Sequence, residues 1–224
     1  MNSLVNSCIN YCTKDDLYKY VAKSKEFMGI KTNEIGLDFY EACSNIKKLA
    51  VRTVNFKDRS LRGLSVPKEN IILLNSSRNR TERNFDCAHE FMHVIKHKNE
   101  NFQTFNCFDT LRPQQSPYLE WQANEGAAEM LVPYKIFIPM FCKSLSNCIT
   151  PADYYSFLDS LAHIFNVPNA VIELRVDNLK YEIHQYENGC DINHIRLLSN
   201  KKQAQRGIHI TSYNTLFDFQ NWII

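Results

Sequence analysis

Residues 87–93 read CAHEFMH, which places the pattern His-Glu-x-x-His inside an apolar segment. On a helix, residues four apart lie on one face, so His89 and His93 can reach one metal ion together. Zinc binds imidazole nitrogens at roughly 2.0–2.1 Å, which this spacing allows. Glu90 lies beside the two histidines and can take a proton from a water molecule that the metal activates. The stretch therefore predicts a hydrolytic zinc site with Glu90 as its general base.

The residues around the motif predict a helix with one apolar face buried in the protein core. Apolar side chains recur at i, i+3, i+7 and i+10, a stripe that favours burial of one face: Phe85, Ala88, Met92 and Ile95. We do not expect His97 to be a third ligand, because a continuous helix rises about 12 Å between His89 and His97. We expect His97 at the helix end, near the C-terminal dipole.

A catalytic zinc ion needs one further protein ligand and an open position for water. Asn99 stands where metzincins place a third histidine, so that class is not indicated. A second helix is predicted over residues 117–132, with Ser116 as N-cap, Pro117 at its first position and Pro133 after its end. This helix carries three glutamates, and the rotation of 100° per residue along a helix places them on different faces.

Glu120 shares its helix face with small or polar residues, which would let this helix approach the motif helix closely. Glu125 points about 140° away from Glu120 and Glu129 about 180° away, so only one of the three can face the metal well. Asn124 follows Glu120 by one turn and is expected to orient a ligand by hydrogen bonding. We predict Glu120 as the third zinc ligand; the alternative is an ordinary first-turn glutamate favoured by the helix dipole.

Together the two segments resemble the ImmA/IrrE family of bacterial metallo-endopeptidases. The sequence RNFDCAHEFMH at residues 83–93 is similar to that family's active-site helix, and residues 120–133 are similar to its Glu-x-x-Ala-Asn helix that closes on Leu-x-Pro. The resemblance covers roughly residues 15–180 and is strongest over 68–133. It implies that His89, His93 and Glu120 bind zinc and that Glu90 is the catalytic base. It also implies a zincin-like α+β fold, in which a small sheet flanks the active-site helix and its edge strand pairs with an extended substrate.

Two positions depart from the family pattern. Met92 stands where the family usually has a small residue, and Gly126 stands where it usually has an aromatic one. Glycine in a helix interior costs about 1 kcal/mol relative to alanine. We interpret position 126 as altered packing rather than lost chemistry, because neither residue is a predicted ligand or base.

Composition bounds the class of protein. The chain has 224 residues, of which 44% are hydrophobic and 22% charged, with a net charge of +2, so strong attraction to nucleic acid or membranes is not expected. No apolar run of about 18 residues occurs, and residues 1–16 lack the features of a signal peptide, which predicts a cytoplasmic protein. The eight cysteines are spread irregularly and are expected to be reduced, mostly buried thiols.

Hydrophobic patterning gives a coarse outline of the other elements. Helices are predicted over residues 15–28 and 34–48, and strands over 49–54 and 70–75, with a turn at 62–65. Residues 99–115 are polar and irregular, either a surface loop or a rim of the cleft. Residues 134–142 form an aromatic-rich stretch that Pro139 should break.

A pair of apolar-faced helices over residues 151–180 resembles a helix-turn-helix, so DNA binding is a second hypothesis. Charge argues against it, because this segment has four acids and two bases, which gives 2 − 4 = −2. We predict a zinc peptidase domain over residues 1–180 that includes this pair, and an extension of unknown role over 181–224. Within the extension, strands are predicted at 181–183 and 207–210, with a hairpin at Asn188-Gly189.

The predicted function is zinc-dependent hydrolysis of a peptide bond in an intracellular protein. The family resemblance implies that this substrate is a partner repressor of the helix-turn-helix type or an antitoxin, encoded beside the enzyme. The alternative is a regulatory protein-binding or DNA-binding module in which the zinc ion is structural. The residue that would stabilise the oxyanion is not assigned, and Tyr118 and Tyr134 are candidates only because they lie near the second helix in sequence.

Overall fold

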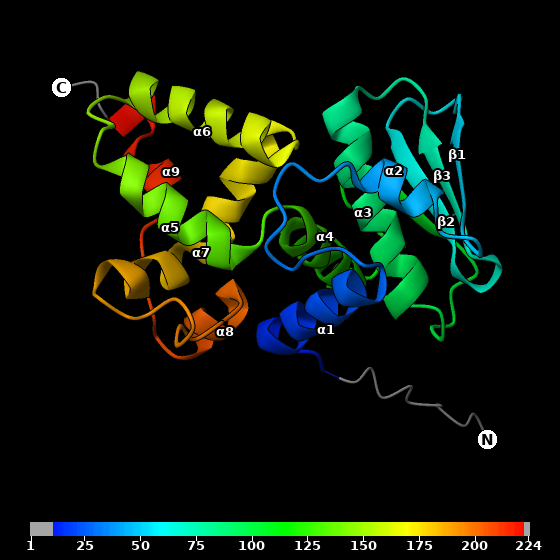
Figure 1. Cartoon of the computed structure of the whole chain (residues 1–224), viewed down its shortest axis with the longest axis horizontal. Helices are drawn as coiled ribbons and strands as arrows, with labels where there is room; N and C mark the ends of the chain where they lie inside the picture. The colour runs from blue at the N-terminus through cyan, green and yellow to red at the C-terminus, as the bar shows by residue number, and fades with distance from the viewer. Residues whose placement is uncertain (1–10, 222–224) are drawn as a thin grey trace.

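The computed structural model describes residues 11–221. A small sheet lies at one end of the molecule, and most of the helices lie to one side of it (Figure 1). In Figure 1 the sheet lies with α2 and α3 at one end of the molecule, α4 and α1 lie in the middle, and α5, α6, α7 and α9 form the other end. This mixed α+β architecture agrees with the predicted fold class. Cys8 and most of the segment tested for a signal peptide lie outside the described residues.

The sheet has four strands in the order β1-β3-β2-β4. Their bounds are Ala50–Val54 for β1, Leu61–Val66 for β2, Ile71–Asn75 for β3 and Phe105–Phe108 for β4. β1 and β3 run parallel, whereas β2 pairs antiparallel with both β3 and β4. The predicted strands at 49–54 and 70–75 are therefore confirmed, and β4 is an edge strand among the described residues.

The turn predicted at residues 62–65 is wrong, because these residues lie inside β2. β2 contains a glycine and an arginine, which have little preference for strands, but it is paired along both edges. Residues 99–115 likewise contain β4, whose Phe105 and Cys107 are buried. In both strands pairing with neighbours decides the structure, and a local pattern cannot report it.

Helix α3 (Arg80–Lys96) carries the His-Glu-x-x-His motif and packs against β2, β3 and β4. Asn79 caps it, with Glu82 completing a capping box. Asp86 is fully buried and accepts hydrogen bonds from the side chains of Arg62 on β2 and Arg78 before the helix. These bonds fix the rotation of α3 relative to the sheet.

Helix α4 (Pro117–Leu131) packs along α3. Its predicted start is confirmed: the Ser116 side chain accepts a hydrogen bond from the backbone N–H of Leu119, and Pro117 is the first residue. The helix ends at Leu131, two residues before Pro133. α1 (Lys14–Phe27) lies against α4 and matches the helix predicted over residues 15–28.

Two other helices differ from the predictions. The helix predicted over 34–48 is shorter, because α2 spans only Phe39–Ser44 after Gly36, whose φ is +66°. Pro139 does not break its segment, since α5 runs over Tyr134–Leu145. The completely buried side chains of Phe137, Ile138 and Phe141 supply hydrophobic stabilisation that outweighs the lost backbone hydrogen bond.

The predicted pair at 151–180 is present as α6 (Pro151–Phe165) and α7 (Asn169–Glu187). The strand at 181–183 and the hairpin at Asn188-Gly189 are wrong, because α7 continues through that region and Gly189, with φ +86°, follows its C-cap. The strand at 207–210 is also absent from the assigned elements, where α8 (Asn200–Gln205), α9 (Tyr213–Leu216) and a 3₁₀ turn (Phe219–Asn221) follow instead. The division of the chain at residue 180 stays a prediction; α7 runs across it.

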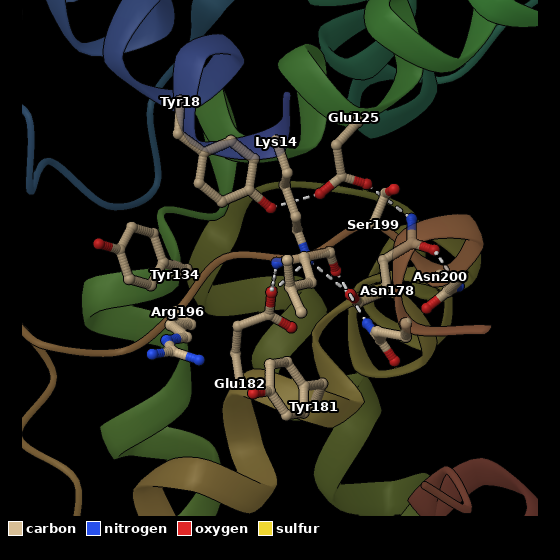
Figure 2. Close-up of polar contacts among 12 residues, drawn as sticks. Lys14, Tyr18, Glu125, Tyr134, Asn178, Tyr181, Glu182, Arg196, Ser199 and Asn200 are labelled. Carbon is tan, nitrogen blue, oxygen red and sulfur yellow. Dashed lines mark hydrogen bonds and ion pairs between the residues drawn. The ribbon is translucent and has the colours of Figure 1, made fainter. Parts of the chain in front are cut away.

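A buried set of charges joins α1, α4 and α7 (Figure 2). Lys14 forms an ion pair with Glu182 at 2.9 Å, and Asn178 donates to Glu125 at 2.8 Å. Arg175, which has no exposed area, donates to Glu125 at 2.9 Å and also pairs with Glu129. Tyr18 also belongs to this set, because its hydroxyl donates a hydrogen bond to Glu125. Removing one partner would leave a buried charge uncompensated, so this set ties α4 firmly to the C-terminal helices.

The seven cysteines among residues 11–221 form no disulfide with one another. Three of them are buried and four are half-buried, so the expectation of mostly buried thiols holds only in part. Over the same residues, no helix has both the length and the apolar character that a bilayer-crossing segment needs.

Candidate metal centre

The two histidines of the motif point their Nε2 atoms at a common position. These atoms are 3.2 Å apart, and both side chains are almost completely buried on α3. The helix places them one turn apart, as the spacing predicts. His89 and His93 therefore present two imidazole nitrogens to one small volume.

Glu120 on α4 supplies carboxylate oxygens to the same volume. Its Oε2 lies 3.3 Å from His89 Nε2, and its Oε1 lies 3.7 Å from His93 Nε2. Three ligand atoms bound tetrahedrally to zinc at 2.0–2.2 Å lie about 3.3–3.6 Å from one another. The observed separations agree with that geometry, and two imidazoles with one carboxylate are a donor set that zinc accepts with a position left open. The residues therefore fit the zinc ion that the sequence predicts.

Hydrogen bonds to the far side of each imidazole set its orientation. Asn124 Oδ1 lies 3.0 Å from His89 Nδ1, and His97 Nδ1 lies 2.8 Å from His93 Nδ1. His97 in turn contacts Gln122 Oε1 through its Nε2 at 3.1 Å. The Nε2 atoms of His89 and His93 keep a free lone pair if the two Nδ1–H groups donate, and His97 then donates to Gln122.

His97 is thus in contact with a candidate ligand, which the sequence does not predict. It was expected only at the helix end, where it indeed caps α3, but its side chain is buried and bonded to His93. The i, i+4 spacing between His93 and His97 was the available signal, since it places them on one face. Its partner Gln122 lies on α4, so the contact links the motif helix to the helix of Glu120.

The pKa values of these groups differ in how they suit metal binding. Burial lowers the pKa of His93 to about 3 and that of His97 to about 4, so both imidazoles are neutral at neutral pH. Burial also acts to lower the pKa of His89, but interactions with Cys107, Glu120 and Glu90 raise that pKa well above its usual value, so this imidazole must lose a proton before it can bind a metal. Burial alone would raise the pKa of Glu120, but hydrogen bonds from His89 and His93 hold that pKa well below its usual value, and an ionised carboxylate is the form that binds a cation.

Glu90 lies beside the ligands, against β2. A Cβ atom at Gly63 would be only 2.9 Å from Glu90 Oε1, so glycine at that position leaves the room that the carboxylate occupies. Both Glu90 oxygens are buried without a hydrogen-bond partner among the described residues, and so is the hydroxyl of Ser65 nearby. Burial raises the pKa of Glu90 to about 7, which would suit a group that accepts and returns a proton near neutral pH.

The other carboxylates and tyrosines considered from the sequence lie elsewhere. Glu125 and Glu129 point to the buried set around Arg175, as the rotation argument required. The Tyr118 hydroxyl bonds to the main chain of Cys12, and the Tyr134 ring packs on Tyr18 with centroids 5.5 Å apart. Neither tyrosine makes a contact, among those of the described residues, that supports a role at the metal ligands.

The two departures from the family pattern fit one another. A Cβ atom at position 126 would lie 2.6 Å from Met92 Cε and 3.0 Å from Met92 Sδ. Both residues are buried where α3 and α4 pack together. The larger Met92 on one helix is therefore accommodated by the glycine on the other, which agrees with the interpretation of altered packing.

Gly126→Ala is expected to destabilise the protein although alanine is the better helix former. The new methyl group would meet Met92, and overpacking of a core typically costs about 1–3 kcal/mol, more than the roughly 1 kcal/mol that alanine gains in a helix. Thermal and urea unfolding of the metal-free protein measures the effect. Met92→Ala alone should also destabilise the protein, because it leaves a cavity in the core, but adding Gly126→Ala to it should cost much less than Gly126→Ala costs in the wild type. Additive losses in the double variant would show that the two positions are not coupled.

The fold and the site together define a class. A His-Glu-x-x-His helix on a small sheet, with a glutamate from the next helix facing both histidines, is the arrangement of zincin-like metallopeptidases. The family model for peptidase M78, described as the IrrE N-terminal-like domain, matches residues 46–177, which is more than half of the chain. The chain belongs to this family.

The comparison with solved structures supports the fold alone. A Mycobacterium tuberculosis transcriptional regulator is similar with a TM-score of 0.50 and 16% sequence identity. The match covers 74% of this chain and 47% of that protein, so the chain corresponds to about half of the regulator's length. No curated protein matches the chain significantly.

Proposed function

We propose that the protein is a zinc-dependent endopeptidase, with His89, His93 and Glu120 as metal ligands and Glu90 as general base. The observation that carries the proposal is the convergence of the two Nε2 atoms, 3.2 Å apart, with the Glu120 carboxylate, whose Oε2 lies 3.3 Å from His89 and whose Oε1 lies 3.7 Å from His93, an arrangement that suits one tetrahedral ion. Membership of a metallopeptidase family supports it independently.

The roles of the residues follow from their positions. When bound, zinc would polarise the scissile carbonyl and lower the pKa of a water molecule. Glu90, with its pKa raised to about 7, takes a proton from the attacking water and returns it to the leaving amine. Asn124 and His97 hold the two imidazoles in the orientation that leaves each Nε2 free.

The free edge of β4 is the proposed place for the substrate backbone. β4 pairs with β2 along one side only among the described strands, so its other side can accept an extended peptide. Phe105 at the start of this strand stacks on His93 with ring centroids 4.2 Å apart, which places the strand beside the metal ligands. A peptide added to this edge would run past the centre.

The proposed substrate is an intracellular protein, a helix-turn-helix repressor or an antitoxin, and α6 with α7 is the proposed docking surface. Arg175, one of the two bases in this pair, is completely buried, so its charge is not available to DNA phosphates. The outer surface of the pair is consequently more acidic than the sequence count implies, which suits a basic protein domain. No observation favours direct DNA binding.

Reversing the charge of an acidic residue on α7 can test docking, but Asp177 and Glu173 are not equally suitable. Asp177 accepts hydrogen bonds from Ser212 and Asn214, so its reversal would also detach the segment around α9. The side chain of Glu173 is partly exposed. Glu173→Lys is therefore the more specific change, and Glu26→Lys on the exposed face of α1 is a matched control.

We expect the purified protein to cleave the repressor or antitoxin encoded beside its gene at one or a few positions. Mass spectrometry of the fragments maps the cleavage, and a chelator should stop it because the ligands alone cannot activate water. Glu173→Lys should slow cleavage several-fold, whereas Glu26→Lys should not. An intact repressor, together with degradation of unrelated unfolded proteins, would contradict the substrate assignment.

A further inference from the structure

A groove lies between α1 and the second half of α3, and we call it the α1–α3 groove. It has a volume of about 530 Å³, and Phe91, Val94 and Ile95 of α3 contribute to its apolar floor. The rotation of the helix turns these residues roughly away from the two motif histidines. Leu49, just before β1, also lines the groove, and β1 and β4 are opposite edges of the sheet. A molecule in this groove would therefore leave the proposed metal centre and the free edge of β4 uncovered.

One face of α1 forms a wall of the groove and carries an exposed phenylalanine. Tyr20, Lys23, Ser24 and Phe27 recur at i, i+3, i+4 and i+7, and all four line the groove. Phe27 is 92% exposed, more than any other large apolar side chain within residues 11–221. The Tyr20 hydroxyl donates to the backbone oxygen of Ile95 at 2.7 Å, which ties α1 to α3 across the floor. The groove is thus preformed, with exposed apolar area beside it, as interaction sites commonly are.

The charges that line the groove have one sign. Lys23 lies on α1, Lys48 before β1 and Lys98 after α3, and no acidic residue lines the groove in the described part of the chain. None of the three lysines takes part in an ion pair within residues 11–221, and the Lys98 ammonium donates to the neutral amide of Asn70 at 3.1 Å. Positive charges that come from three separate elements and have no counter-charge favour a partner with several negative charges.

We propose that the α1–α3 groove is a docking site for an acidic amphipathic helix of a partner protein. A groove between two helices accepts a third helix, whose apolar face fills the hollow and whose flanking carboxylates meet the lysines. The shape favours a protein over a membrane, because the floor is recessed and a bilayer cannot enter a hollow to reach it. The three separate lysines favour a helix over a fatty acid, which has a single carboxylate. This partner differs in charge from the basic substrate proposed for α6 and α7.

Selection from a phage-displayed peptide library tests the proposal without knowledge of the partner. The full-length protein is the target, and random peptides of about 16 residues are long enough for roughly four helical turns. The enriched peptides should combine large apolar residues at i, i+3 or i+4 and i+7 with acidic residues on both flanks. One of them, made synthetically with a fluorescent label, then serves as the probe in anisotropy titrations.

Charge reversal on the rim should weaken binding of this peptide. Lys48→Glu/Lys98→Glu replaces two attractions by two repulsions, and we expect the dissociation constant to rise at least about tenfold. Both lysines are exposed, so circular dichroism should show an unchanged fold. Lys143→Glu makes the same change on an exposed position of α5, at the other end of the molecule (Figure 1), and should leave binding unchanged because solvent and salt screen so distant a charge.

Removal of the exposed aromatic ring tests the apolar part of the groove. Phe27→Ala should weaken binding several-fold without loss of stability, because the ring is almost fully exposed in the free protein. Ile149→Ala is the matched control, since Ile149 is 76% exposed and does not line the groove.

The outcomes decide the proposal independently of hydrolysis and of zinc. Enriched peptides that are neutral or basic would overturn it, and so would acidic peptides that bind the double lysine variant as tightly as the wild type. A library that yields no binder, together with sedimentation on phosphatidylcholine–phosphatidylserine vesicles that the double variant loses, would assign the groove to a membrane surface and also overturn it. Each of these results would leave the proposed peptidase standing.

Discussion

Glu90→Gln is expected to abolish peptide hydrolysis while the protein keeps its fold and its metal ion. Glutamine has nearly the same shape as glutamate but cannot accept a proton, and loss of a general base typically lowers the rate by about 10²–10⁴-fold. Glu90 is fully buried and its carboxylate makes no hydrogen bond among the described residues, so a neutral side chain should cost little stability. Steady-state kinetics, metal analysis and circular dichroism measure the three properties.

A matched control lies on the same helix. Glu82→Gln makes the same chemical change at the start of α3, where glutamine can replace glutamate in the capping box. We expect this variant to keep activity. Should Glu90→Gln retain the full biological activity of the wild type, the protein would act by contact, and the regulatory binding hypothesis would replace the peptidase.

The part of the site that lies on helices followed from the sequence. The period of 3.6 residues places His89 and His93 on one face and separates Glu120 from Glu125 and Glu129, and the structure has the same arrangement. The start of α4 could also be predicted from the sequence, because Ser116 and Pro117 act within its first turn. These features are local, so neighbouring residues contain the necessary information.

The parts that depend on distant pairing did not follow. β2 has weak strand propensity and exists because β3 and β4 pair with it, which in turn brings Gly63 and Cys107 to the motif helix. α7 passes through a segment that reads as a strand, because Glu182 and Ile183 are buried there. Such contacts join residues far apart in the chain, and no spacing rule applies to them.

The second large effect is a loss of zinc binding on substitution of Glu120. The contacts of Glu125 decide which substitution on the same helix can serve as its control. Glu125→Ala would leave Arg175 buried with one partner fewer, and breaking a buried pair costs about 3–5 kcal/mol. Glu125→Gln keeps the shape and can still accept hydrogen bonds from Arg175 and Tyr18. Glu120→Gln and Glu125→Gln therefore make the same change on one helix, with only the first facing the two histidines.

Elemental analysis of purified protein after dialysis tests the metal centre most directly. We predict about one Zn²⁺ per chain in the wild type, in Glu90→Gln and in Glu125→Gln, because none of these changes removes a ligand. Glu120→Gln should weaken zinc binding by at least about a hundredfold, since even changes to residues that only orient ligands cost 10–100-fold. A wild-type protein without zinc, or equal loss in Glu120→Gln and Glu125→Gln, would contradict the assignment of His89, His93 and Glu120.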